Sequence, residues 1–67
     1  MEFRTFGLNV AKQRIKKGLS AYELSLQLSK DPSYISKLES GNVNVTLKVI
    51  LEIANVLEIP PKTLFEE

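Results

Sequence analysis

The stretch SAYELSLQLSKDPSYISKLESG, residues 20–41, contains two short helical patterns separated by a three-residue break. Ser20 and Glu23 form the capping-box pattern S-x-x-E, in which the serine oxygen accepts a backbone N–H and the glutamate side chain accepts the N–H of the serine. Leu24 and Leu28 follow one helical turn apart, which places both on one side of a helix. The first pattern therefore predicts a short helix with one buried face.

The second pattern begins directly after the break. Asp31 is a good N-cap residue, and Pro32 suits the first helical position, where a missing N–H is no loss. Ile35 and Leu38 give this helix a buried side, and Gly41 stands where a glycine commonly closes a helix. Two helices joined by so short a break must cross steeply over a small shared core. Residues 20–40 are therefore predicted to form a helix-turn-helix.

The remainder of the chain adds three helical segments and no strand signal. Gly18 closes the first segment, Thr46 caps a fourth, and Pro61 starts a short last turn. The predicted helices cover residues 6–17, 21–28, 32–40, 47–57 and 61–65. Sixty-seven residues allow one small domain. We therefore expect an all-α fold, a compact five-helix domain over residues 1–67.

The predicted fourth helix is apolar on nearly every side. One stripe consists of Leu47, Ile50, Leu51, Ala54 and Leu57, and a second consists of Val49, Ile53 and Val56. A monomer of this size cannot bury both stripes without help. In one interpretation, the C-terminal tail covers the second stripe within the chain. In the other, which we favour, this stripe and the tail form a two-fold symmetric homodimer contact. The predicted dimer interface is Val49, Ile53, Val56, Ile59, Leu64 and Phe65.

Composition excludes several classes of function. The chain has neither cysteine nor histidine, and its acidic residues are scattered without metal-ligand spacing. It also lacks a glycine-rich phosphate loop. We therefore expect no enzyme, no metal and no cofactor. No segment approaches the roughly 18 apolar residues of a membrane span, and the N-terminus has no signal-peptide core. The expected location is the cytoplasm, without a membrane partner.

Charge is distributed unevenly although the net charge is only +1. Residues 1–41 carry seven basic and four acidic residues, whereas residues 42–67 carry two basic and four acidic residues. This asymmetry indicates a weakly basic face on the N-terminal half. Chance in a short chain is the alternative explanation.

Several segments resemble the lambda-repressor-like, or Xre-type, helix-turn-helix family in order and spacing. The matching segments are Arg14, residues 17–20 (KGLS), 23–24 (EL), 33–41 (SYISKLESG), 53–57 (IANVL) and 64–65 (LF). The run SYISKLESG followed by NVNVTL is most similar to short stand-alone regulators of the family. These include controller proteins of restriction-modification systems and small phage or mobile-element repressors. The resemblance implies a DNA-binding transcriptional regulator whose helix 32–40 enters the major groove.

Five positions depart from the family pattern. The family usually has glutamine at Ala21, where it touches a phosphate, and alanine at Ser25, where two helices approach closely. It usually has glycine at Ser29 in the turn, because that residue often takes a positive φ. An apolar residue is usual at Lys30, and proline is common at Val45. The departure at Ala21 affects an expected phosphate contact, and those at Ser29 and Lys30 affect the geometry of the turn.

The resemblance implies a reading surface on the side of helix 32–40 that faces away from its buried residues. The candidates for base contacts are Pro32, Ser33, Ser36 and Lys37. Lys37 is the strongest, because an ammonium group donates to guanine O6 and N7. A solvated surface lysine is the alternative. The candidates for phosphate contacts are Ser20, Tyr22, Tyr34, Ser40, Asn42 and Asn44. For the asparagines the alternative is a purely local role in the turn, and for Tyr34 it is packing.

The resemblance also implies that Arg14 and Glu39 form a partly buried ion pair that supports the fold. With two copies of the chain, the expected function is sequence-specific regulation of transcription by a homodimer on a near-palindromic operator in double-stranded DNA. RNA polymerase is a further candidate partner. The alternative from another class is a protein-interaction module, an Xre fold with a weakened DNA surface that is used for its apolar fourth helix.

Overall fold

The computed structural model describes residues 3–66, with the backbone alone for Phe3. Along these residues lie α1 (Phe3–Lys17), α2 (Ala21–Gln27), α3 (Tyr34–Glu39), α4 (Leu47–Leu57) and the 3-10 helix η1 (Pro61–Phe65). No strand occurs in residues 3–66. The all-α prediction is confirmed, but the count of five α-helices is wrong, because the last segment is a 3-10 helix that follows two prolines.

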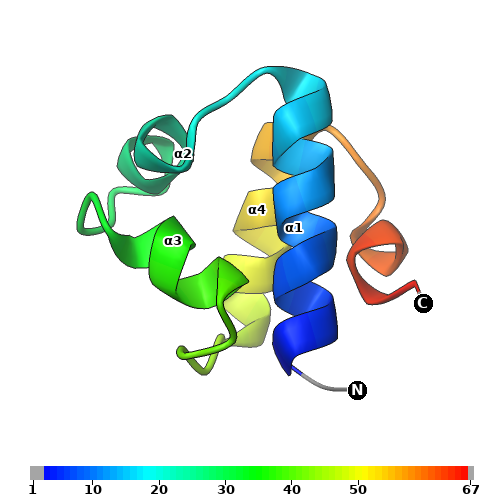
Figure 1. Ribbon diagram of the computed structural model, residues 1–67. Helices are drawn as coiled ribbons and strands as arrows, with labels where there is room; N and C mark the ends of the chain where they lie inside the picture. The colour runs from blue at the N-terminus through cyan, green and yellow to red at the C-terminus, as the bar shows by residue number, and fades with distance from the viewer. Residues whose placement is uncertain (1–2, 67) are drawn as a thin grey trace.

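The helices surround one small core. Figure 1 shows α1 running in front of α4, with α2 and α3 on one side and η1 on the other. Every one of these elements contributes buried side chains. The core consists of Phe6, Val10, Leu24, Leu28, Ile35, Leu38, Val49, Ile50, Ile53, Ala54, Leu57 and Leu64. The helix-turn-helix therefore rests on a platform made by α1 and α4.

Local interactions define the ends of the first helices as the sequence predicts. The N–H of Glu23 donates to Ser20 Oγ at 3.0 Å, and the N–H of Ser20 donates to Glu23 Oε1 at 2.7 Å, so the capping box is complete. Gly18 follows α1 with φ +80°. Ser29 follows α2 with φ +59°, the left-handed conformation for which the family prefers glycine. Serine adopts it here at some cost in conformational energy.

The start of α3 differs from the prediction. Helical structure begins at Tyr34 rather than at Pro32. The Asp31 carboxylate accepts the N–H of Ser33 at 2.8 Å, and the Asp31 carbonyl accepts the N–H of Tyr34 at 2.9 Å. These bonds hold residues 31–34 in a turn, which delays the helix by two residues. Asp31 thus caps a turn, and α3 is shorter than expected.

The rotation of α4 about its axis is also different from the prediction. Val49 and Ile53 are 6% and 0% exposed, whereas Leu47 and Leu51 are 70% and 48% exposed. The expected buried stripe was therefore wrong at Leu47 and Leu51. Thr46 does cap the helix, with its Oγ1 accepting the N–H of Val49 at 3.2 Å.

Burial within one protomer also removes part of the predicted dimer interface. Val49, Ile53 and Leu64 are buried in the core of the single chain and are not available to a second copy. Leu64 is buried because η1 packs against both α1 and α4 and brings this side chain into the core. Val56 and Ile59 are half-buried against the same core, and Phe65 is 38% exposed. The interpretation in which the tail covers α4 is therefore correct for Leu64.

The C-terminal segment is tied to α1 by polar and aromatic contacts. The Asn9 side-chain amide donates to the carbonyl of Leu64 at 3.0 Å and to that of Glu66 at 2.6 Å. The ring of Phe65 lies 5.6 Å from that of Phe6, centroid to centroid. Within the described residues, no helix has the length and apolar character needed to cross a membrane.

Candidate nucleic-acid interface

The four side chains predicted to contact bases are gathered on one exposed surface. Pro32 and Ser33 lie in the turn before α3, and Ser36 and Lys37 lie on the outer side of α3; all four are exposed. Ile35 and Leu38, on the inner side of the same helix, are 0% and 1% exposed. The structure therefore brings the predicted base contacts together and separates them from the core.

Asp31 belongs to this surface, although the sequence indicated only a capping role. Its Oδ1 accepts the hydroxyl hydrogen of Ser33 at 2.6 Å as well as the N–H of Ser33. These bonds from Ser33 lower the pKa of the Asp31 carboxyl, and the positive charge of Lys37 lowers it further. Because the only hydroxyl hydrogen of Ser33 is used by Asp31, the Ser33 hydroxyl can act only as an acceptor toward a ligand.

Ser25 joins α2 to the start of α3. Its hydroxyl is fully buried, donates to the carbonyl of Ala21 at 2.8 Å, and accepts the N–H of Ile35 at 3.0 Å. The N–H of Ile35 belongs to the first turn of α3, where backbone donors lack a partner inside the helix. Ser33 provides no side-chain cap there. Ser25 therefore caps α3 from the neighbouring helix α2. Its hydroxyl, which departs from the family pattern, has a hydrogen-bond partner both as donor and as acceptor.

The other end of α3 is anchored to α1 by Arg14 and Glu39. Arg14 Nε lies 2.7 Å from Glu39 Oε2 and Arg14 Nη2 lies 3.1 Å from Glu39 Oε1, so the pair is bidentate. Arg14 Nη1 also donates to the carbonyl of Leu19 at 2.9 Å. The two side chains are 15% and 14% exposed, and the hydrogen bonds to Glu39 raise the pKa of Arg14. The ion pair expected from the resemblance is present.

Gly7 allows α1 to approach the end of α3 more closely than any side chain would permit. A Cβ placed on Gly7 would lie 2.6 Å from the Glu39 carbonyl oxygen and 2.7 Å from that of Leu38. No sequence pattern pointed to this contact, because a glycine inside a helix carries no partner information. The close contact at Gly7 and the ion pair of Arg14 together set the angle at which α3 packs against α1.

The candidates for phosphate contact at the start of α2 are exposed. Ser20 Oγ accepts the N–H of Glu23, which leaves its hydroxyl hydrogen free to donate outward. Tyr22 is 57% exposed beside it. At this end the structure keeps both predicted side chains accessible to a ligand.

The candidates after α3 are connected to each other. Ser40 Oγ donates to the Lys37 carbonyl at 2.8 Å and accepts from the Asn42 side-chain amide at 3.0 Å. The single hydroxyl hydrogen of Ser40 is thus used inside the protein, whereas Asn42 keeps a second N–H. Asn44 is exposed further along the loop. Ser40 therefore orients Asn42 in this structure.

Tyr34 is half-buried at the start of α3. Burial raises the pKa of its hydroxyl, and the negative charge of Glu52 on α4 raises it further. The Lys30 ammonium lies 5.4 Å from the centre of its ring. These contacts favour the packing interpretation for Tyr34 over the phosphate contact.

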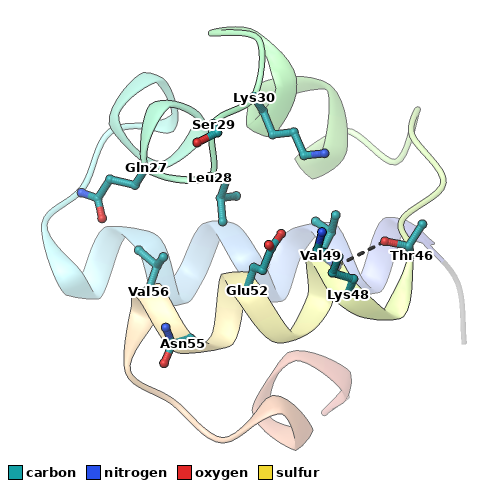
Figure 2. Close-up of a pocket in the computed structure, with 10 residues that line it drawn as sticks. All are labelled: Gln27, Leu28, Ser29, Lys30, Thr46, Lys48, Val49, Glu52, Asn55 and Val56. Carbon is teal, nitrogen blue, oxygen red and sulfur yellow. Dashed lines mark hydrogen bonds between the residues drawn. The ribbon is translucent and has the colours of Figure 1, made fainter.

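An open groove of about 510 Å³ lies between the end of α2 and α4. Figure 2 shows Leu28 above Val49 and Val56, with Lys30, Lys48 and Glu52 around them. None of the predicted DNA-contacting residues lines this groove. Over residues 3–66 there is also no group of three or more acidic residues that could hold a metal ion.

An exposed α3 that is anchored at both ends and rests, together with α2, on α1 and α4 is the arrangement of a helix-turn-helix DNA-binding domain. The helix-turn-helix family model HTH_3 matches residues 10–64. The chain therefore belongs to this helix-turn-helix family, whose lambda-repressor-like members are DNA-binding transcription regulators.

The solved structures that are similar to this one include a controller protein and a gene regulator. The restriction-modification controller protein C.AhdI from Aeromonas hydrophila is 38% identical, with 94% of this chain and 96% of that chain aligned at a TM-score of 0.88. The clp gene regulator ClgR from Corynebacterium glutamicum is 23% identical, with 97% and 70% aligned at a TM-score of 0.88, which shows a shared fold. A comparison with curated protein sequences gave no significant match.

Proposed function

We propose that the protein is a homodimeric transcriptional regulator that binds a near-palindromic operator with α3 and its preceding turn in the major groove. The observation that carries this proposal is the exposed cluster of Pro32, Ser33, Ser36 and Lys37 on a helix anchored at both ends. Lys37 would donate to guanine, and Pro32 would contact a thymine methyl group. Ser33 would accept a hydrogen bond from a base edge, and Ser36 would donate or accept one.

Phosphate contacts on either side of α3 would position the reading surface. Ser20 and Tyr22 would donate to one phosphate, and Asn42 and Asn44 to another. The hydrogen bond from Asn42 to Ser40 supports this arrangement, since it holds the amide beside the end of α3. Tyr34 would contribute through packing.

The dimer contact would be made by the exposed side of α4. Leu47 and Leu51 stand one turn apart and leave a large apolar area uncovered in the monomer, 70% and 48% exposed. A two-fold axis beside them would bury the same residues from both copies. It would also set two recognition helices about 34 Å apart, one turn of DNA.

Regulation would follow from occupation of the operator in the cytoplasm, with RNA polymerase as a further partner. The 38% identity to C.AhdI over nearly the full chain supports assignment to the controller proteins of restriction-modification systems. An adjacent methyltransferase gene and nuclease gene would support that assignment, and an unrelated genomic setting would contradict it.

A gel-shift assay against genomic fragments at two salt concentrations tests the proposed function. We expect a specific complex at low salt that weakens steeply at higher salt, because phosphate contacts release counterions. The second candidate is a protein-interaction module, which Ala21 at the usual glutamine position and the net charge of +1 favour. Absence of a specific complex at low salt, with the protein folded, would support that candidate instead.

A further inference from the structure

We propose that Arg4 is an additional phosphate contact, placed at the junction between α1 and the loop after α3. This inference rests on the proposed DNA-binding function and extends its site to a residue that no sequence motif indicated. The ligand of Arg4 would be a phosphate group of the DNA backbone, next to the phosphate contacted by Asn42. The argument begins with how closely the two segments approach.

The backbone of Arg4 lies against Gly41. The point that a Cβ on Gly41 would occupy is 3.4 Å from the Arg4 Cα and 3.7 Å from the Arg4 Cβ. Gly41 closes α3 with φ +83° and immediately precedes Asn42. The side chain of Arg4 therefore starts within one residue of a candidate phosphate contact.

The position of Arg4 is fixed by a second contact on the same side of α1. Gly7, one turn further along, packs against the carbonyl groups of Leu38 and Glu39. These two contacts hold the first turns of α1 on the end of α3. The backbone of Arg4 therefore keeps a fixed position relative to α3.

The positive charge of Arg4 suits contact with a DNA phosphate. The other candidates after α3 are the neutral residues Ser40, Asn42 and Asn44. Arg4 is exposed and makes no salt bridge with any residue between 3 and 66. A guanidinium group also matches phosphate geometry, because it donates two parallel hydrogen bonds. Arg4 thus adds a cation beside a group of phosphate-contact candidates that are all neutral.

The test measures DNA affinity by fluorescence anisotropy over a series of salt concentrations, for the wild type, Arg4→Ala, Arg4→Lys and Lys12→Ala. Lys12 is the matched control, because it is an exposed cation on the same helix two turns away. Thermal melting of each variant checks that the fold is retained.

For Arg4→Ala we expect two changes for each protomer on the DNA. The magnitude of the slope of log K against log salt should fall by about 0.9, and the affinity near 0.1 M salt should fall roughly tenfold. Arg4→Lys should keep the wild-type slope, and Lys12→Ala should behave as the wild type. An unchanged slope in Arg4→Ala, or an equal change in Lys12→Ala, would overturn the inference. Failure of the wild type to bind any DNA would instead overturn the proposed function.

Discussion

The hydroxyl of Ser25 accepts the backbone N–H of Ile35 at 3.0 Å while donating to the carbonyl of Ala21 at 2.8 Å. One fully buried side chain thus ties α3 to α2, at the point where α3 has no cap of its own. The orientation of α3 depends on this bond at one end and on the ion pair of Arg14 and Glu39 at the other.

Replacing Ser25 with alanine should lower the free energy of unfolding by about 1–3 kcal/mol, since the N–H of Ile35 would stay buried without a partner. Chemical denaturation measures the change. Ser36→Ala is the control, because Ser36 is exposed on α3, and it should alter stability by no more than about 0.5 kcal/mol. Equal stability of the two variants would contradict the role of Ser25 as a cap.

Replacing Glu39 with alanine should cost about 1–3 kcal/mol, because the largely buried guanidinium of Arg14 would lose both of its carboxylate bonds. The control is Lys17→Ala, which removes the ion pair between Lys17 and the exposed Glu58 and should cost no more than about 1 kcal/mol. Thermal unfolding followed by circular dichroism compares them. A melting temperature unchanged in Glu39→Ala would show that the pair does not support the fold.

Asp31 should make stability depend on pH at the acid end. Its folded pKa lies below the ordinary value of 3.8 because Ser33 donates two hydrogen bonds to the carboxylate. The contribution to stability is therefore fully present above that value and is lost as the pH falls through the folded pKa. Asp31→Asn should show a shallower loss of melting temperature on acidification than the wild type. Carboxyl carbon NMR shifts of Asp31 that titrate at or above 3.8 would contradict this.

Lys37 should carry more sequence discrimination than any other single side chain on α3. Lys37→Ala is expected to weaken binding to the preferred DNA by about 1–3 kcal/mol and to relax selectivity at one base pair. Lys62→Ala, an exposed lysine on η1 on the opposite side of α1, is the control and should bind normally. Equal losses on specific and unrelated DNA would make Lys37 a phosphate contact instead.

Leu51 should be needed for the proposed dimer. Leu51→Asp would place a charge in the apolar contact of α4 and should give a monomer in sedimentation velocity at micromolar concentration. Leu26→Asp on α2 is a close control, because Leu26 and Leu51 are both 48% exposed. A dimer that survives Leu51→Asp but not Leu26→Asp would place the contact on α2.

Much of the helix-turn-helix could be predicted from local sequence signals. Ser20 with Glu23 and the glycines after helices act through neighbours in the chain, so short patterns predict them. The rotation of α4 could not be predicted, because Val49 and Leu47 are equally apolar and the choice between them depends on how segments distant in the sequence pack against α4. The late start of α3 depends on a turn that the Asp31 side chain stabilises. The sequence does not separate this role from that of an N-cap, because aspartate suits both positions.

The parts of the site that sequence reasoning missed are contacts between distant segments. Gly7 lies against the carbonyls that end α3, and Arg4 lies against Gly41. Neither residue type suggests a partner, so only the packing of α1 on α3 reveals them. Ser25 is intermediate, since the resemblance placed it where two helices approach closely but did not show which donor its hydroxyl would bind.

Selection of bound sequences from a random DNA pool tests the central claim most directly. The account predicts enrichment of a short inverted repeat whose half-sites are centred about one helical turn, roughly 34 Å, apart. It also predicts that Lys37→Ala degrades one position in each half-site equally, because both copies of α3 read the same sequence. Recovery of no enriched motif by the folded wild-type protein, or of a single half-site without symmetry, would contradict it.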